Sequence, residues 1–528
     1  MAALDLTTNF TGMDWAIVAI YLAVSLAIGI FANRFIHTVK AYLVGGGASG
    51  TSLNAATYIS TGLGLVTLMY AGIDGFSHGF AYVTLALIGF ATGVILGVTG
   101  LVIKPLRQMK LLTIPEFFEK RFSRRVRIVG GIICAVAGIV NMGLFPKMGA
   151  MFITYATGIG AHVENPEMTV NVITSALIVL VLVYTVLGGM VSVIITDYIQ
   201  FIVLSVGMGL GVYFCLSHPA LGWDNMLNTI AEHRGEMMFN PVAAKGGYGW
   251  IWIVFNLLVF LVAGFCWAPE ASRALTARNA SVAKRTFLIA APGQFVRLGI
   301  PVLWAIAAFT LVSQDQPLTA FFFPDGLDQV PTHAGAAMPL ALGKIVPAGL
   351  LGVLVAGLLA AFMSTHDSYL LCWSSVISRD VVSPLLGHKL SGSQEILVTR
   401  ISVVAIGAFL LVWGIWYELP ESVWTYMAVS GTIYLSGAGV VLLGGIYWKR
   451  ASTVGALAAM IAGLIAIVGL FLNPFNAQLR EWGIEYKLTG PVVGLFNFGL
   501  CAVVFVVVSL LIPDTPKPQS AQPPPAGQ

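Results

Sequence analysis

This sequence has little charge. Only 9% of its 528 residues are charged and 58% are hydrophobic, whereas a soluble globular domain carries about 25% charged residues. Apolar runs of about 20 residues recur along the chain, and each can cross a bilayer as an α-helix. A β-barrel would instead show alternating apolar and polar residues in segments of about ten. The composition excludes an ordinary soluble protein and predicts an all-α polytopic membrane protein.

The sequence has few cysteines, and its first apolar run lacks the basic residues that begin a signal peptide. The five cysteines lie within apolar runs, and their spacing fits no zinc site, so we expect buried, apolar thiols. The first apolar run has no basic start, and Asp5 and Asp14 stand there instead. We therefore expect a transmembrane helix of the mature protein. The net charge of +4 is modest and carries no information about nucleic acid, and no nucleic-acid partner is expected.

Thirteen apolar runs are predicted to be transmembrane helices. They are residues 14–33, 52–72, 79–103, 128–157, 170–187, 190–216, 248–269, 287–312, 340–377, 395–417, 422–448, 453–473 and 489–512. No soluble domain fits in the remaining loops. The end of the chain is rich in Pro and polar residues, so we expect it to be disordered.

Basic residues are distributed unevenly between the loops. With the N-terminus outside, twenty Lys and Arg fall on the cytoplasmic side and four on the outer side. Because Lys and Arg collect in cytoplasmic loops, we expect the N-terminus outside and the C-terminus in the cytoplasm. The expected location is the plasma (inner) membrane.

Two predicted helices contain residues that interrupt helical structure. The second span (52–72) holds Gly62 and Gly64, and the seventh holds Gly264 and Pro269. Broken helices at membrane depth must be buried in protein or line a cavity, and in transporters with inverted repeats they bind ion and substrate. The two lie five spans apart, an odd number, so the second enters from the opposite side. Close helix packing through small residues is the simpler alternative.

Three motifs resemble those of the sodium:solute symporter family. Residues 184–200, YTVLGGMVSVIITDYIQ, are similar to the family signature. Residues 111–122, LLTIPEFFEKRF, are similar to its first large cytoplasmic loop, and residues 442–463, LLGGIYWKRASTVGALAAMIAG, to its late Trp-Lys-Arg motif. The resemblance implies a LeuT-like core of two inverted five-helix repeats. It also implies a transporter, not an enzyme, driven by Na⁺ as the coupling ion.

The chain then divides into six expected parts. These are an extra N-terminal helix and loop (1–51), the first inverted repeat (52–216), an extracellular loop (217–247), the second inverted repeat (248–450), two C-terminal helices (451–512) and a disordered cytoplasmic tail (513–528).

The resemblance implies a Na⁺ site between the second and ninth spans. The family pattern places backbone carbonyl ligands at Ala56, Ile59 and Ala361, and hydroxyl ligands at Ser364 and Thr365. Alkali cations favour oxygen ligands, and a neutral cage binds weakly enough to release the ion. The three ligands in the ninth span lie on one helix face. The alternative is that the hydroxyls only bond the carbonyl four residues earlier.

Ionisable residues within membrane spans are costly and often functional. The resemblance implies that Asp197 lies near the ion's exit path, where some family members bind a second Na⁺. Asp367 and Ser368 are candidates for the same site. The alternative role for Asp367 is an ion pair or a helix contact that faces water on the inner side. An intramembrane aspartyl protease also needs two carboxylates, but neither aspartate has a Gly-x-Gly-Asp context. His366 is expected to pack, with proton coupling as the alternative.

The predicted substrate pocket is mostly apolar with few polar anchors. Its candidate residues are Tyr58, Thr61, Asn141, Lys147, Phe265 and Trp267. The resemblance implies that Lys147 can meet a substrate carboxylate, with snorkelling as the alternative. Sugar-carrying relatives have Asn and Glu where this chain has Tyr58 and Ala86. This difference argues against a hexose, and the mostly apolar pocket with few polar anchors favours a carboxylate or an amino acid over a polyol.

The sequence thus predicts a secondary active transporter that couples inward Na⁺ movement to uptake of a small organic solute by alternating access. A Na⁺/sugar symporter and a sensor or channel-like member of the same fold are the alternatives. The expected partners are the solute and the lipid bilayer, and no obligatory protein partner is indicated.

Overall fold

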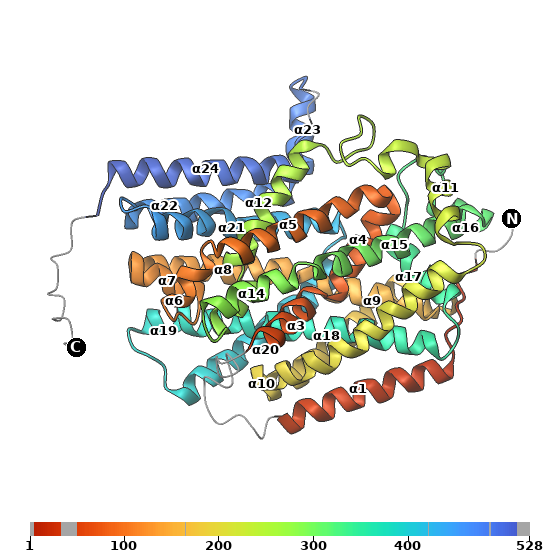
Figure 1. The fold of residues 1–528 in the computed structure, drawn as a ribbon, viewed down its shortest axis with the longest axis horizontal. Helices are drawn as coiled ribbons and strands as arrows, with labels where there is room; N and C mark the ends of the chain where they lie inside the picture. Colours follow the sequence, from red (N-terminus) through yellow and green to blue (C-terminus); the bar gives the residue numbers. More distant parts are fainter. Residues whose placement is uncertain (1–4, 33–49, 164, 421, 485–486, 515–528) are drawn as a thin grey trace.

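The structure, a computed structural model, describes residues 5–32, 50–163, 165–420, 422–484 and 487–514. The elements assigned in these ranges are all helices, packed as an elongated bundle in which most helices follow the long axis (Figure 1). The predicted all-α membrane architecture is therefore confirmed. The expected C-terminal tail falls almost entirely outside the described residues.

The α-helices have the following bounds. The first half of the chain contains α1 Gly12–Ala32, α3 Thr51–Gly62, α4 Leu65–His78, α5 Val83–Thr99, α6 Ile103–Gln108, α7 Ile114–Arg121, α8 Arg124–Asn141, α9 Phe145–Ala156 and α10 Pro166–Ser217. The second half contains α11 Trp223–Arg234, α12 Trp250–Cys266, α13 Ala268–Thr276, α14 Ala280–Ala290, α15 Gly293–Ser313, α16 Gln316–Phe322, α17 Ala334–Ile345, α18 Leu350–Val376, α19 Ser383–Leu386, α20 Gly392–Trp416, α21 Val423–Tyr447, α22 Thr453–Gly463, α23 Leu472–Glu481 and α24 Gly490–Leu511.

Side-chain caps begin several of these helices. Ser123 accepts the backbone N–H of Val126 at the start of α8. Ser391 and Gln394 form a reciprocal capping box at the start of α20. Each such cap satisfies an N–H that has no partner within the helix, and it stabilises the helix by about 1 kcal/mol.

The predicted number of spans is not confirmed. In the described ranges, nine helical segments are long and apolar enough to cross a membrane, or ten if the bent pair α12 and α13 counts as one. The predicted spans 170–187 and 190–216 both fall in α10, which is 52 residues long. At about 1.5 Å per residue this is more than twice the thickness of the hydrocarbon core. The predicted break between those two spans is absent from the helix as assigned.

One further predicted span was wrong because a break was overlooked. The span 340–377 is made of two helices, α17 and α18, with Pro347 and Gly349 between them. Gly349 has φ of 83°, a left-handed conformation that favours glycine, and Pro347 cannot donate a helical hydrogen bond. The predicted span 287–312 lies within Ala280–Ser313, a single segment long and apolar enough to cross a membrane, in which α14 and α15 follow one another closely.

Both predicted broken helices are interrupted in the structure. The first breaks at Leu63 and Gly64, between α3 and α4. The second breaks at Trp267, between α12 and α13. This position lies between the two residues expected to cause the break, Gly264 and Pro269. Pro269 instead lies in the first turn of α13, where its missing N–H costs no helical bond.

Helix α18 lies at the centre of the bundle. It contacts both α1 and α10 and also α3, α4, α9, α13 and α20. Residues 354–368 are all buried, so every polar side chain in this stretch must find its partners within the protein. The centre of the molecule is therefore the place where the two halves of the chain meet.

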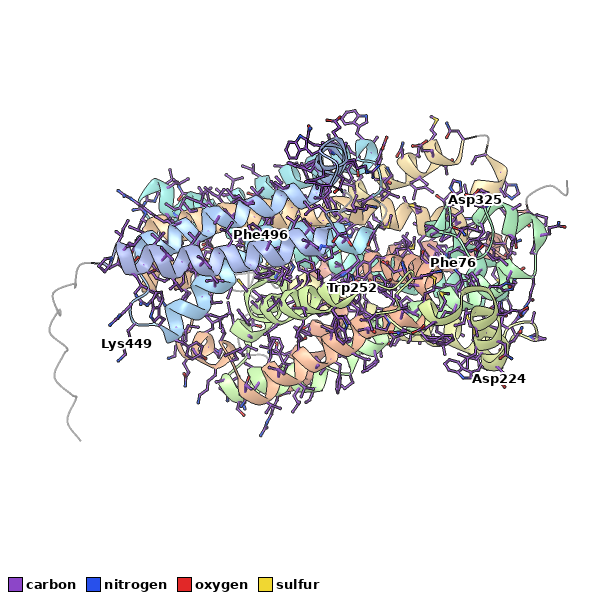
Figure 2. The ribbon with its side chains drawn as sticks, turned by 90° about the horizontal axis from the view of Figure 1, so that it is seen from above. Phe76, Asp224, Trp252, Asp325, Lys449 and Phe496 are labelled. Carbon is purple, nitrogen blue, oxygen red and sulfur yellow. The ribbon has the colours of Figure 1, made fainter. Side chains whose placement is uncertain are left out.

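The first and last described helices reach opposite ends of the bundle. In Figure 1 the start of α1 and the end of α24 lie at opposite ends of the long axis. Figure 2 places Lys449 at one end and both Asp224 and Asp325 at the other.

Candidate ion and solute site

The break between α3 and α4 faces α18. A Cβ added to Gly64 would lie 2.5 Å from the hydroxyl oxygen of Thr365, well inside van der Waals contact. Thr365 donates its hydroxyl to the backbone carbonyl of Thr61 at 3.3 Å. The absence of a side chain at Gly64 therefore allows the unwound backbone to approach a hydroxyl of α18.

More hydroxyls of α18 pair with the same end of α3. The hydroxyl oxygens of Ser364 and Ser60 are 3.2 Å apart, and those of Ser368 and Thr61 are 3.4 Å apart. These four side chains are buried. The structure thus brings the predicted residues of α18 to the break in α3–α4, and the oxygens that meet there are uncharged.

The predicted carbonyl ligands lie nearby on the backbone. Ile59 lies in the last turn of α3, and its carbonyl accepts the N–H of Leu63 at 2.8 Å. A carbonyl oxygen has two lone pairs, so this bond leaves one free to accept. Ala56 lies one turn earlier on α3, and Ala361 is buried on α18. The carbonyl that directly meets Thr365 is that of Thr61, which had been predicted only as a substrate contact.

The two aspartates predicted at the second ion site, Asp197 and Asp367, are buried and have different partners. Asp197 accepts the hydroxyl of Ser364 at 2.5 Å. Asp367 accepts the hydroxyl of Thr185 at 2.7 Å. Asp197 is therefore linked directly to the hydroxyl cluster at the break, whereas Asp367 bonds to α10 at the preceding part of the signature motif.

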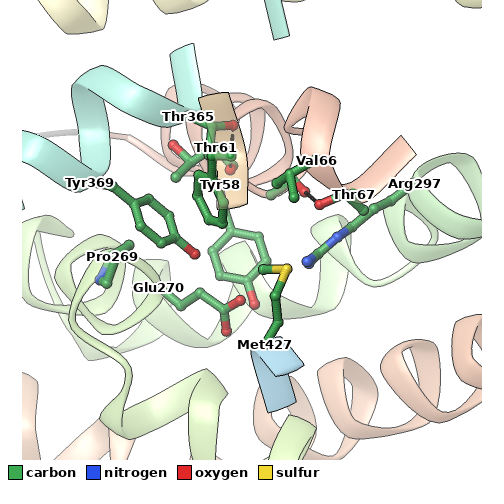
Figure 3. Close-up of a pocket in the computed structure, with 12 residues that line it drawn as sticks. Tyr58, Thr61, Val66, Thr67, Pro269, Glu270, Arg297, Thr365, Tyr369 and Met427 are labelled. Atoms are coloured by element: carbon green, nitrogen blue, oxygen red, sulfur yellow. Dashed lines mark hydrogen bonds between the residues drawn. The ribbon is translucent and has the colours of Figure 1, made fainter. Parts of the chain in front are cut away.

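A small pocket lies between the two broken helices (Figure 3). Its lining comprises Tyr58, Thr61, Gly62, Val66, Thr67, Phe145, Pro269, Glu270, Arg297, Thr365, Tyr369 and Met427. These residues come from α3, α4, α9, α13, α15, α18 and α21, so both halves of the chain contribute. The free space is about 20 Å³, roughly the room for one water molecule. The walls are therefore closely packed around the centre of the site.

Two predicted substrate contacts, Asn141 and Lys147, lie outside the lining of this pocket. Asn141 donates its side-chain amide to the carbonyl of Met427 at 2.7 Å. The Lys147 ammonium donates to the carbonyl of Tyr417 at 3.0 Å. Helix periodicity does not show how α8 and α9 are rotated against their neighbours, so it could not predict that both side chains donate to backbone carbonyls of other segments.

The two predicted aromatic contacts also lie outside the lining. Phe265 is fully buried in α12. Trp267 donates its indole N–H to the hydroxyl of Tyr369 at 3.2 Å and packs against the ring of Trp373. Trp267 therefore lies behind Tyr369, which itself lines the pocket.

The sequence prediction did not include Glu270 and Arg297 among the pocket residues. Glu270 lies in the first turn of α13 and Arg297 lies on α15. The signal available was their charge, because an ionisable residue within a predicted span often marks a functional site. Their positions in the sequence did not indicate that they lie close together, because 26 residues and two helix breaks separate them.

His366 packs as expected. Its Nδ1 lies 2.7 Å from the carbonyl of Phe362, and the two rings have centroids 3.9 Å apart. Four of the five cysteines are buried and Cys372 is half-buried, and all are free thiols.

Long apolar helices, two of them broken at the same central pocket, define a membrane transporter. The model of the family described as "Sodium:solute symporter family" matches residues 42–463. The chain therefore belongs to the sodium:solute symporter family. It is an integral membrane protein and a sodium-coupled transporter of that family, not an enzyme.

Three relatives illustrate the range of the family. The human high affinity choline transporter 1 is 27% identical over 489 residues, covering 87% of this chain and 77% of the relative. The sodium/sialic acid symporter SiaT of Proteus mirabilis is 24% identical over 482 residues, covering 87% and 90%. The human sodium/glucose cotransporter 4 is 24% identical over 578 residues, covering 98% and 78%.

A solved structure shares the fold. The substrate-bound, outward-open Na⁺-coupled sialic acid symporter superposes with a TM-score of 0.73 and 20% identity, covering 96% of this chain and 99% of the other. This likeness supports the LeuT-like fold expected from the motifs.

Proposed function

We propose that this protein carries a small organic solute into the cell together with Na⁺ by alternating access. The observation that carries the proposal is the contact between the broken helix α3–α4 and the hydroxyl face of α18, where Thr365 meets the Thr61 carbonyl at 3.3 Å. Unwound backbone beside uncharged hydroxyls is suited to a cation that must bind and leave again. Alkali cations favour oxygen donors.

Na⁺ is held, in this proposal, by the carbonyls of Ala56, Ile59 and Ala361 and the hydroxyls of Ser364 and Thr365. What supports this set is its position: the hydroxyls of α18 and the last turn of α3 lie within hydrogen-bonding distance of each other. Ser364 donates its hydroxyl to Asp197 at 2.5 Å and Thr365 donates to the Thr61 carbonyl at 3.3 Å, so an ion bound here would replace hydrogen bonds and not a salt bridge.

A second ion position or exit path is proposed around Asp197, with Ser368 and Asp367 as further members. The support is the 2.5 Å hydrogen bond between Asp197 and Ser364, which links the carboxylate to the first set. A buried carboxylate next to an ion route lowers the cost of bringing a cation there. Asp367 is the weaker member, because its oxygen is bonded to Thr185.

The proposed orientation has the N-terminus outside and the C-terminus in the cytoplasm. Twenty Lys and Arg against four on the other side support it. Lys449 lies at the end of the bundle where α24 ends, which is the proposed cytoplasmic end (Figures 1 and 2). The plasma membrane is the proposed location.

The solute is proposed to be a small carboxylate or amino acid. The printed names of the relatives do not decide it, since choline is a cation, sialic acid an acid and glucose a neutral sugar. The pocket supports the proposal because it contains ionisable side chains, and its free space of about 20 Å³ means that the walls must move apart when a solute enters.

The test is uptake into proteoliposomes that contain the full-length chain. An inward Na⁺ gradient should drive solute accumulation, and the same gradient of K⁺ should not. One positive charge moving through 100 mV contributes about 2.3 kcal/mol, so adding an inside-negative potential should increase uptake if net charge enters. Equal uptake with K⁺, or with a proton gradient alone, would overturn the proposal.

A further inference from the structure

Glu270 and Arg297 line the same pocket in the centre of the membrane bundle. Figure 3 shows their side chains reaching into it from different helices. Among the described residues, Glu270 forms no hydrogen bond, and it forms no ion pair with Arg297 or any other cation. Two opposite charges that share a membrane cavity without pairing are costly. Something that enters the cavity can satisfy both.

Arg297 lies at the break between α3 and α4. A Cβ added to Gly62 would lie 3.3 Å from one of its terminal nitrogens. Its other terminal nitrogen donates to the hydroxyl of Tyr70 at 3.4 Å, and its Nε is buried without a partner. A guanidinium presents a planar fork that matches a carboxylate. Val66 and Thr67, in the first turn of α4, also line this part, and a helix N-terminus favours negative charge.

Glu270 lies at the other broken helix, among aromatic rings. Tyr58 and Tyr369 line the pocket with it. Tyr369 is held in place by Trp267, whose indole N–H it accepts at 3.2 Å, and Tyr58 packs on Phe287. A carboxylate together with aromatic faces is a combination that attracts an ammonium group. The two broken helices therefore offer opposite charges to one ligand.

We propose that the solute is a small zwitterion, whose carboxylate meets Arg297 at the start of α4 and whose ammonium meets Glu270 at the start of α13. This inference rests on the proposed function and specifies its solute. A zwitterion neutralises both side chains and adds no net charge, so the charge that crosses the membrane is that of Na⁺ alone. A monoanion leaves Glu270 without a partner, a monocation leaves Arg297 without one, and a polyol leaves both.

The alternative is a purely structural role for both groups. Glu270 could only stabilise the N-terminus of α13, and Arg297 could only tie α15 to Tyr70. A structural role predicts that substitutions weaken every ligand equally. A recognition role predicts that each substitution weakens only ligands that carry the matching charge.

The experiment measures thermal unfolding of the purified full-length protein with a matched panel of solutes, in Na⁺ and in K⁺. One series is L-alanine, propionate and ethylamine; another is L-proline, cyclopentanecarboxylate and pyrrolidine; glucose represents the polyols. In Na⁺ a zwitterion should stabilise the protein at concentrations at least about tenfold lower than its two charge-deleted analogues, a gap of about 1.4 kcal/mol. In K⁺ this stabilisation should be lost.

Two variants assign the charges. Glu270→Gln should weaken binding of the zwitterion about tenfold or more and leave binding of the monoanion unchanged. Arg297→Gln should weaken the zwitterion by a similar factor and leave the monocation unchanged. Glu270→Asp and Arg297→Lys should restore part of the affinity. Na⁺ without solute should still stabilise all four variants, and this stabilisation shows that each variant is folded.

The possible failures are distinct. The inference is overturned if a monoanion, a monocation or glucose is the tightest ligand, if no zwitterion binds in Na⁺, or if Glu270→Gln and Arg297→Gln weaken every ligand equally. If instead Na⁺ does not stabilise the unsubstituted protein more than K⁺ does, the proposed sodium coupling itself fails.

Discussion

The two broken helices differ in what faces each break. At α3–α4 the neighbouring side chains on α18 are hydroxyls, and the partner at 3.3 Å is a backbone carbonyl. At α12–α13 the break is an aromatic residue, Trp267, followed within three positions by the carboxylate of Glu270. At the first break the contacts from α18 are neutral oxygens, with Arg297 beside Gly62 and Asp197 bonded to Ser364, whereas the second break has aromatic rings and a carboxylate.

This difference corresponds to two different tasks. A bare cation that must be released favours neutral oxygens, because a full negative charge would hold it too strongly. An organic solute is recognised by shape, ring contacts and a few charged or hydrogen-bonding groups. In the proposal above, Na⁺ binds at the α3–α4 break, and the solute contacts both the α3–α4 break and the α12–α13 break. Substitutions at each break should therefore have separable effects on Na⁺ and on the solute.

The largest effect is expected from Gly64→Ala. The added Cβ would lie 2.5 Å from the Thr365 hydroxyl oxygen, and overpacking of this kind costs about 1–3 kcal/mol. Displacing Thr365 should raise the Na⁺ concentration for half-maximal uptake by about tenfold or more, in line with about 1.4 kcal/mol per tenfold. The measurement is Na⁺-dependent uptake in proteoliposomes, together with the melting temperature.

Gly299→Ala is the matched control for that variant. Gly299 also lies in a membrane helix, α15, but nothing lies within 4 Å of its added Cβ. Its Na⁺ dependence should be unchanged. If the two alanine variants behave alike, the close approach at the first break is not part of the ion site.

A smaller effect is expected from Thr365→Val, which removes the hydroxyl and keeps the shape. The variant loses one proposed Na⁺ ligand and the bond to the Thr61 carbonyl, worth about 1 kcal/mol. We expect the half-saturating Na⁺ concentration to rise about three- to tenfold while solute affinity at saturating Na⁺ changes less. Thr310→Val is the control, because Thr310 is buried and bonds only the Ile306 carbonyl of its own helix. An unchanged Na⁺ dependence in Thr365→Val would remove Thr365 from the site.

The features that were predictable from the sequence are those encoded by local chemistry. Gly64 and the hydroxyl spacing of Ser364 and Thr365 are local signals, and they correctly indicated a break and a polar helix face. The break at Pro347 and Gly349 was also visible locally, but the long apolar run masked it. Whether a helix break was predicted correctly or overlooked therefore depends on a few neighbouring residues of the sequence.

Membership of the pocket depends instead on tertiary packing. Lys147 was a reasonable candidate from its depth and charge, yet the rotation of α9 points it at the Tyr417 carbonyl. Glu270 and Arg297 carried the same kind of signal and do line the pocket. Periodicity places a residue on a face of its own helix but does not say which neighbour that face meets.

The smallest effect is expected from Lys147→Met, which tests whether the solute is recognised only at the two breaks. Lys147 is half-buried and its ammonium donates to the Tyr417 carbonyl at 3.0 Å, outside the pocket lining. Methionine keeps most of the apolar stem and removes one hydrogen bond, so stability should fall by about 1 kcal/mol. Solute affinity should change less than about twofold, which is about 0.4 kcal/mol, for a carboxylate and for a neutral solute alike, because Lys147 does not line the pocket. Binding titrations of both solute types in saturating Na⁺ measure this. A selective loss of carboxylate binding would mean that α9 contacts the solute directly, and the separation of ion and solute recognition between the two breaks would then be incomplete.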